Sequence, residues 1–154
     1  MFTIRKFQPG EELQLRKLFY QTIHNINIGD YSQEQTNAWA PKAYDKAAWV
    51  EKINRLKPYV VEDEGNIVAY GDIQPDGYID HFFCHHNYQG KGIGKALLNQ
   101  LLAVAEKEKV PRVYAHASKT AMPFFRYQGF AVVKEQQVEI RGEVLTNYVV
   151  EKQF

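Results

Sequence analysis

Apolar residues recur at helical spacing in three segments of the chain, and each spacing predicts an amphipathic helix. The first segment covers residues 11–27. The second starts after Asp45, whose side chain can cap a helix, and ends before the next proline. The third covers residues 92–108 and has the broadest apolar face, which predicts the longest helix. Two shorter helices are predicted over residues 32–39, opened by a Ser-x-x-Gln capping box, and over residues 120–127.

Short apolar runs bounded by turn residues predict strands. The turn Asp63-Glu64-Gly65-Asn66 separates two of these runs and predicts a hairpin. A second turn leads into an aromatic run, which we interpret as one continuous strand. The predicted strands are residues 3–8, 59–62, 67–73, 78–84, 112–117, 131–140 and 144–151. The order of these strands and helices along the chain is typical of a mixed α/β fold.

Composition and charge limit the kinds of protein that this chain can be. Its 154 residues, 45% hydrophobic and 24% charged, can bury one core, so we expect a single domain over residues 1–154. A net charge of +1 without a basic block argues against a nucleic acid partner. The single cysteine excludes an internal disulfide. No apolar run approaches membrane-spanning length and the first residues lack an apolar signal core, so we expect no membrane partner and a cytoplasmic location.

Three glycines at alternate positions connect the aromatic run to the longest predicted helix. Gly90, Gly92 and Gly94 lie where the helix should begin, and the first amides of a helix have no internal partner. Glycines also lack the Cβ atoms that would keep a phosphate at a distance. These features predict an anion site, most simply for a pyrophosphate. Neither a dinucleotide fingerprint nor a P-loop fits, because the spacing is Gly-x-Gly-x-Gly and no Ser or Thr follows Lys91.

Residues 89–94, Gln-Gly-Lys-Gly-Ile-Gly, resemble the Q/R-x-x-G-x-G/A signature of the GNAT superfamily of acyl-CoA N-acyltransferases. In that family the turn holds the pyrophosphate of coenzyme A. Residues 31–35, 38–40 and 121–125 further resemble the YafP-like branch. The resemblance implies a GNAT-like fold, a central mixed twisted sheet flanked by helices. It also implies that the strands before and after the longest helix are parallel and splay apart.

The resemblance implies a binding site for acetyl-CoA. In relatives the glycine turn contacts the pyrophosphate through backbone amides, and the strand before it pairs with the pantetheine arm. The implied pyrophosphate residues are Gln89, Gly90, Lys91, Gly92, Ile93, Gly94 and Lys95, and the implied arm residues are Phe82, Phe83 and Cys84. Ser118 stands where the family has an Asn that contacts the same arm. The alternative is a glycine turn that only joins a strand to a helix.

The family resemblance identifies the catalytic residues less clearly than the residues that bind the cofactor. Relatives often carry a carboxylate base on the strand before the turn, which selects Asp80, and a solvated or ion-paired Asp is the alternative. The family's Tyr that protonates the leaving thiolate is Phe125 here. Tyr127 lies two positions further, rotated by about 200°, and could replace it only if the helix ends early. His116, on the strand face of Ser118, is another candidate acid or base. For Tyr127 and His116 a packed structural role is the alternative.

Histidines and the cysteine near the glycine turn suggest a metal site, which we do not favour. His81 and His85 fall on one strand face, whereas Cys84 and His86 fall on the other, so the four do not converge as zinc ligands do. We also do not favour Cys84 as an acyl nucleophile, because the sequence shows no environment that would lower its thiol pKa. The acceptor pocket is expected near the end of the first long helix. Its candidate residues are His24, Tyr31, Tyr44, Trp39 and Trp49, the last two with a core role as the alternative.

We therefore expect an N-acetyltransferase that moves an acetyl group from acetyl-CoA to a primary amine of a small molecule or peptide, by direct attack. A non-catalytic acyl-CoA-binding or regulatory module is the alternative, because Phe125 replaces the usual acid. A nucleotide-binding α/β protein is a third hypothesis. The terminal hairpin and an exposed sheet edge also lead us to expect that the chain can form a homodimer.

Overall fold

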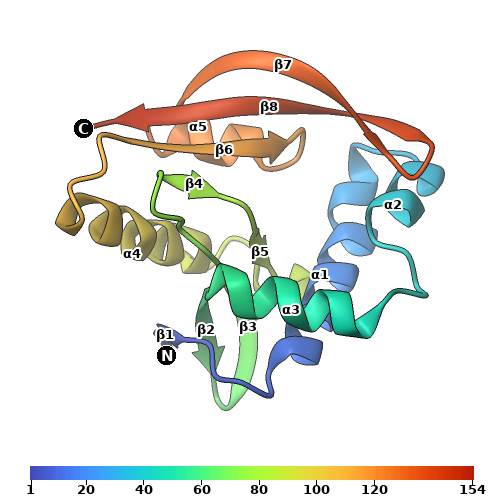
Figure 1. Ribbon diagram of the computed structural model, residues 1–154, viewed down its shortest axis with the longest axis horizontal. Helices are drawn as coiled ribbons and strands as arrows, with labels where there is room; N and C mark the ends of the chain where they lie inside the picture. The colour runs from blue at the N-terminus through green and yellow to red at the C-terminus, as the bar shows by residue number, and fades with distance from the viewer.

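The computed structural model describes residues 1–154, and its strands form two four-stranded sheets. The first contains, in spatial order, β1 (Phe2–Lys6), β2 (Tyr59–Asp63), β3 (Asn66–Gly71) and β5 (Phe82–Cys84). The second contains β4 (Tyr78–Ile79), β6 (Arg112–Ser118), β8 (Glu143–Gln153) and β7 (Ala131–Ile140). Only β4 and β6 pair in parallel. Figure 1 shows the second sheet above the first, with its strands running across the direction of β2 and β3.

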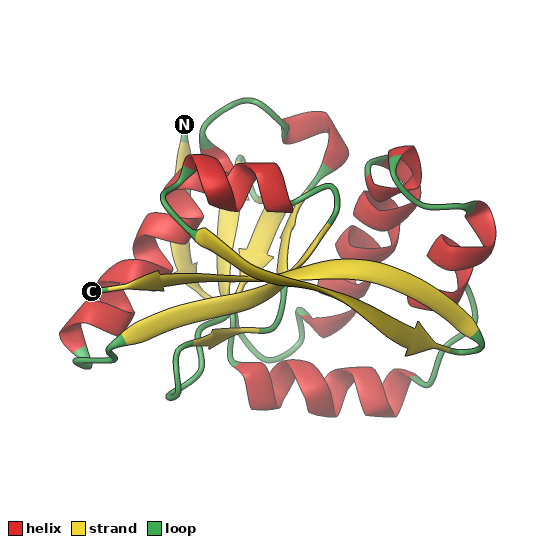
Figure 2. Ribbon diagram, turned by 90° about the horizontal axis from the view of Figure 1, so that it is seen from above, coloured by secondary structure: helices red, strands yellow, loops and turns green.

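Helices surround both sheets, which confirms the predicted mixed α/β fold (Figure 2). They are α1 (Glu12–Asn25), α2 (Gln33–Trp39), α3 (Lys46–Leu56), α4 (Ile93–Lys107) and α5 (Met122–Tyr127), with short 3₁₀ turns η1 (Asn27–Gly29) and η2 (His86–Tyr88). Two predicted caps are confirmed. Ser32 and Gln35 form a capping box at the start of α2, and the Asp45 side chain accepts a hydrogen bond from the Ala48 amide at the start of α3.

The predicted continuous strand over residues 78–84 is wrong. The segment forms β4 and β5, which belong to different sheets. The break has a local cause, because the buried carboxylate of Asp72 accepts hydrogen bonds from the backbone amides of Asp80 and His81, at 3.3 and 2.6 Å. These amides are therefore not available to a strand partner. The parallel strands implied by the family resemblance are present over β4 and β6, and they diverge where β5 turns away to pair with β3.

The longest helix, α4, joins the two sheets through its apolar face. Leu98, Leu101 and Ala105 pack with Val113 and other residues of the second sheet. Ile93 and Leu97 pack instead with the first sheet, against Val61, Val68 and Ala69. A separate cluster packs α1 and α3 against the other face of the first sheet, and its buried members are Leu15, Leu18, Phe19, Ile23, Ala40, Trp49, Ile53, Val60 and Tyr70. The opening between the diverging strands lies among these three clusters.

Predicted helix bounds lie close to the observed ones. The helix predicted over residues 11–27 is Glu12–Asn25, and the one predicted over residues 92–108 is Ile93–Lys107. None of the helices combines the length and the apolar character needed to cross a membrane. The assignment of residues 1–154 to a single domain stays a prediction.

Candidate functional site

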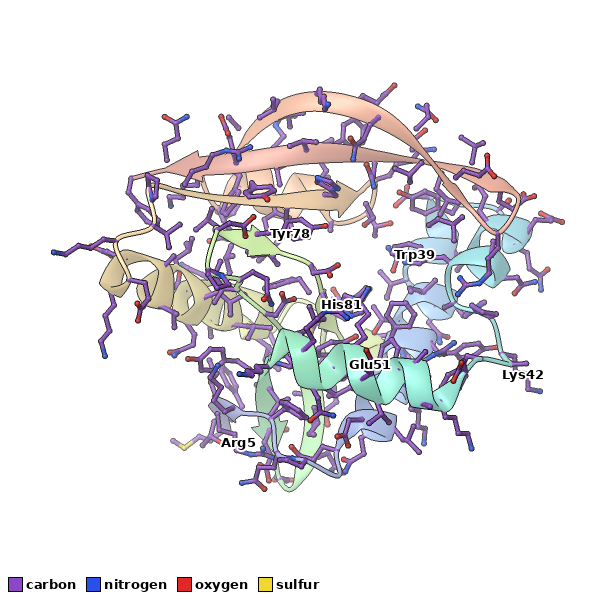
Figure 3. All side chains as sticks on the ribbon, in the orientation of Figure 1. Arg5, Trp39, Lys42, Glu51, Tyr78 and His81 are labelled. Atoms are coloured by element: carbon purple, nitrogen blue, oxygen red, sulfur yellow. The ribbon has the colours of Figure 1, made fainter.

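A cavity of about 760 Å³ opens where β4 and β5 diverge from β6. One end is formed by the glycine turn before α4, and the other by residues of α1, α2, α3 and the β7–β8 hairpin. Figure 3 shows Tyr78, His81 and Trp39 around this opening in the middle of the molecule. The volume falls in the range of small-molecule and cofactor sites in proteins. The cavity is therefore the candidate functional site.

The glycine turn presents unpaired backbone amides to the cavity. The first hydrogen bond of α4 runs from the Ala96 amide to the Gly92 carbonyl at 3.0 Å, so the preceding helical amides have no partner within the helix. Gly90 and Gly92 have φ angles of +73° and +79°, a conformation that favours glycine. A Cβ atom on either residue would meet no protein atom within 4 Å. The turn thus offers free donors and open space, which fits a phosphate group.

Not every predicted turn residue can contribute a side chain. Gln89, Gly90, Gly92, Gly94 and Lys95 line the cavity. The side chain of Ile93 is only 3% exposed and packs in the core, so this residue can act only through its backbone amide. The ammonium group of Lys91 lies 5.2 Å from the ring centre of Tyr88 and does not line the cavity.

Two open strand edges face each other across the middle of the cavity. β5 ends the first sheet and pairs only with β3, through Phe82, Phe83 and Cys84. β6 pairs with β4 only as far as Ala115, so its remaining residues lack a partner on that side. An extended ligand can pair with such edges like an added strand. Ser118 lies at the end of β6, where its hydroxyl accepts a hydrogen bond from the Ala121 amide at 3.0 Å.

The Cys84 thiol is unsuited to nucleophilic catalysis. Burial raises its pKa to about 11, which keeps it protonated at neutral pH. The histidines nearby are not gathered around it. His81 contacts the Tyr70 hydroxyl, whereas His85 contacts Gln21, and no group of three His, Cys, Asp or Glu side chains in the structure could hold a metal ion.

The predicted base, Asp80, lies in the wall of the cavity at the break between β4 and β5. Its side chain is 27% exposed. The only charged partner is Lys52 on α3, whose ammonium nitrogen is 3.8 Å from a carboxylate oxygen. This single long contact leaves lone pairs of the carboxylate free to accept a proton from a ligand.

Two buried ionisable residues beside Asp80 were not identified from the sequence as functional. Burial raises the pKa of Asp72 to about 6, and Gln74 donates a hydrogen bond to its carboxylate at 2.7 Å. His81 lines the cavity, stacks on Phe19 and shares a hydrogen bond of 2.9 Å with the Tyr70 hydroxyl. Burial lowers its pKa to about 3, so it is neutral near pH 7. The Asp72 carboxylate holds the backbone amide of Asp80 in place, and no sequence pattern marks this role.

The candidate acids occupy different places. Tyr127 is 89% exposed and does not line the cavity, so the structure does not support it as an acid. The physical reason is helical rotation, because Phe125 on the same helix points into the core and the residue two positions later points outward. His116 does line the cavity, with its ring 5.3 Å from that of Tyr78. Its pKa is lowered by burial, and the charge of Asp80 opposes this shift.

Aromatic side chains line the end of the cavity away from the glycine turn. They are Phe19, Tyr31, Trp39, Tyr44 and Trp49, of which Phe19 and Trp49 are also part of the core. His24 does not line the cavity, because its ring binds the Ala40 carbonyl instead. Arg16 was missed by sequence reasoning, although a charged residue on the apolar face of α1, in line with Phe19 and Ile23, could have revealed it.

Comparisons with known proteins agree with this geometry. A sequence model described as "Acetyltransferase (GNAT) domain" matches residues 27–152. The curated "Uncharacterized N-acetyltransferase YafP" of Escherichia coli (strain K12) is 34% identical over 145 residues, which cover 94% of this chain and 91% of that protein.

Solved structures support the same assignment. A GCN5-related N-acetyltransferase from Rhodopseudomonas palustris superposes with a TM-score of 0.94 at 26% identity, covering 99% of this chain and 95% of the other. The PaiA N-acetyltransferase from Thermoplasma acidophilum, solved in complex with coenzyme A, has a TM-score of 0.79 at 17% identity and covers 100% and 99% of the two chains, which shows a shared fold. The chain therefore belongs to the GNAT family of acetyltransferases, within its YafP-like branch, and the cosubstrate of this family is acetyl-CoA.

Proposed function

We propose that the protein transfers an acetyl group from acetyl-CoA to a primary amine of a small molecule or peptide, by direct attack of the amine on the thioester. The proposal is carried by one observation. A single cavity joins the free amides at the start of α4 to the Asp80 carboxylate. One part of this cavity can therefore hold a phosphate group while another receives the proton that an attacking amine must lose.

We place the binding site for acetyl-CoA at the glycine turn and between the open edges of β5 and β6. The pyrophosphate would bind the backbone amides of residues 89–95, with the ammonium group of Lys95 nearby. The pantetheine arm would lie between β5 and the end of β6, against Phe82, Phe83, Cys84 and Ser118. An amide of β5 would then polarise the thioester carbonyl, which stabilises the oxyanion that forms during attack.

Asp80 would accept the proton of the acceptor ammonium, either directly or through a water molecule. The neutral amine then attacks the carbonyl carbon, the carbon–sulfur bond breaks, and the electron pair leaves on the sulfur. The second proton that the amine nitrogen must lose is passed to this thiolate. A thiol has a pKa of about 8.5, so the thiolate is a fairly good leaving group and needs little help from an acid. We propose that His116 relays this proton from the amine nitrogen to the sulfur, since Phe125 has no hydroxyl and Tyr127 lies outside the cavity.

A coupled thiol assay tests this function. Purified protein is incubated with acetyl-CoA and a panel of amines, and free thiol is followed above the rate of hydrolysis. Asp80→Asn should lower kcat by about 100-fold or more while the KM for acetyl-CoA changes little. Asp63→Asn is the matched control, because Asp63 lies on β2 outside the cavity. Unchanged turnover in Asp80→Asn would remove this residue from the mechanism.

A non-catalytic acyl-CoA-binding module remains the second candidate, supported by the buried Phe125 in the place of the family's acid. This candidate predicts that coenzyme A and acetyl-CoA bind in calorimetry while no amine releases thiol. Thiol release with any acceptor excludes it. A nucleotide-binding protein would instead gain thermal stability from ATP or NAD in preference to coenzyme A.

Two further expectations also stay predictions. A homodimer is supported by β7, which is an edge strand with exposed Val132 and Val133, and sedimentation velocity would measure it. A cytoplasmic location is supported only by the sequence features given above.

A further inference from the structure

Two arginine side chains line the end of the cavity away from the glycine turn, which we call the acceptor end, and neither has a carboxylate partner. Arg16 comes from α1, and Arg141 from the turn between β7 and β8. The structure contains five ion pairs, and none of them includes either arginine. A buried cation without a counter-ion is unusual, because removing a charge from water is costly unless it is paired.

Arg16 is held rigidly but left mostly unsatisfied. Its side chain is only 4% exposed, and the guanidinium lies 4.0 Å from the ring centre of Tyr44. The rings of Phe19, Tyr20 and Trp49 surround it at 5.4 to 5.8 Å. A guanidinium carries five N–H donors, but its one hydrogen bond here goes to the Pro41 carbonyl at 2.5 Å. The packing fixes the orientation of the group and leaves donors for a ligand.

Arg141 reaches the cavity from the turn between β7 and β8. It donates one hydrogen bond to the Ala38 carbonyl on α2, at 2.7 Å, and its remaining donors have no protein partner. Its backbone φ of +45° lies in the left-handed region, which a residue other than glycine rarely adopts. The two arginines are close enough to interact electrostatically, because burial and then the charge of Arg141 lower the pKa of Arg16.

The remaining charges at this end do not neutralise the pair. Asp45 lines the cavity but uses its carboxylate to cap α3, through the Ala48 amide at 3.1 Å. Asp80 is already beside Lys52. Lys42 does not line the cavity, and Figure 3 shows it at the outer edge of the molecule. The acceptor end therefore carries excess positive charge in a wall of aromatic rings.

We propose that the acceptor is an amine that also carries a carboxylate, which binds Arg16 and Arg141 while the amine faces Asp80. The proposal rests on the proposed function and names its substrate class. A carboxylate matches the fork of a guanidinium and forms charge-assisted hydrogen bonds with it. Simple amines without an acid group would leave both arginines unpaired and would bind weakly. Free ω-amino acids and short peptides with a free carboxyl terminus share the required chemistry.

Calorimetry with matched probes tests the carboxylate requirement. The probes are δ-aminovalerate and ε-aminocaproate, each against its carboxamide, and glycylglycine against glycylglycinamide. The free and amidated members differ in the acid group, and the dipeptide pair distinguishes a peptide source from a free amino acid. Titrations are run with and without saturating coenzyme A, and the same probes are used in the thiol assay. At least one carboxylate should bind roughly 10- to 100-fold more tightly than its amide.

Variants assign the preference to the two arginines. Arg16→Gln and Arg141→Gln should each reduce the carboxylate preference by about tenfold or more, without changing the affinity for coenzyme A. Arg141 is exposed, so its variant provides the test even if the substitution of the buried Arg16 impairs folding. Arg55→Gln is the matched control, because Arg55 is exposed at the end of α3 and lies outside the cavity. It should keep the full preference.

The outcomes separate the two proposals. Equal binding of carboxylates and amides, or a preference that both arginine variants retain, overturns the carboxylate assignment, even if amines are acetylated. Absence of thiol release with every amine overturns the proposed function, while the binding preference still decides the role of the arginines.

Discussion

Gly92 and Gly65 have nearly the same backbone geometry in very different places. Their φ angles are +79° and +83°, and a Cβ atom on either would meet no protein atom within 4 Å. Gly92 is the N-cap of α4 beside the cavity, whereas Gly65 lies in the turn between β2 and β3. Replacing each glycine by glutamate therefore imposes the same backbone strain. Only Gly92→Glu also places a carboxylate among the amides proposed to bind pyrophosphate.

The magnitudes follow from strain and charge. A left-handed conformation costs a residue other than glycine about 1–2 kcal/mol. For a chain of this size, that lowers Tm by roughly 2–8 °C in both variants. A glutamate at roughly 5 Å from about two phosphate charges adds about 2–7 kcal/mol of repulsion, depending on the effective dielectric constant. The lower limit alone weakens coenzyme A binding by about 30-fold.

Isothermal titration with coenzyme A measures this difference, and a thermal melt of each variant measures the shared strain. We expect Gly92→Glu to lose most of its affinity, and Gly65→Glu to bind like the parent protein with a similar loss of Tm. Parental affinity in Gly92→Glu would falsify the assignment of the α4 start as the pyrophosphate site. An equal loss in Gly65→Glu would show that global stability, and not the local charge, controls binding.

Three further predictions test the surroundings of the site. Burial lowers the pKa of His81 from its ordinary value of 6.5 to about 3, so the unfolded chain takes up a proton that the folded protein does not, and stability falls as pH falls through this range. Relative to His81→Gln, the free energy of unfolding in urea should fall by about 2 kcal/mol between about pH 6.5 and pH 5, and a difference that does not change with pH would refute the reasoning. Asp72, whose pKa is raised to about 6, has the opposite effect on stability, but it is present in both proteins and does not enter their difference. Iodoacetamide at about pH 8 should modify Cys84 roughly 100-fold more slowly in the folded protein than in urea, because its pKa of about 11 leaves little thiolate; similar rates would contradict this. Tyr127→Phe should keep turnover within about twofold, and a large loss of kcat would restore Tyr127 as a candidate acid.

Candidate residues near the turn could be predicted because their roles depend on local chemistry. The glycines at positions 90 and 92 reveal a helix start with free amides, whatever the rest of the fold. The residue that protonates the leaving thiolate was harder to predict, since whether Phe125 or Tyr127 points inward depends on where α5 packs. His81 was not identified because it becomes distinctive only through its tertiary contacts, such as the hydrogen bond with the Tyr70 hydroxyl. Arg16 left a local signal, its place on the apolar face of α1, but its role in the cavity depends on where that helix packs.

The sequence by itself determined the helices, most of the strands and the place of the glycine turn, since periodicity, caps and turn residues act over a few neighbouring positions. The tertiary structure decided that residues 78–84 form two strands, because the buried Asp72 carboxylate binds the amides at the break. It also brought Arg16 and Arg141, 125 positions apart in the sequence, to one end of one cavity. Such contacts depend on packing between distant elements, which no local pattern encodes.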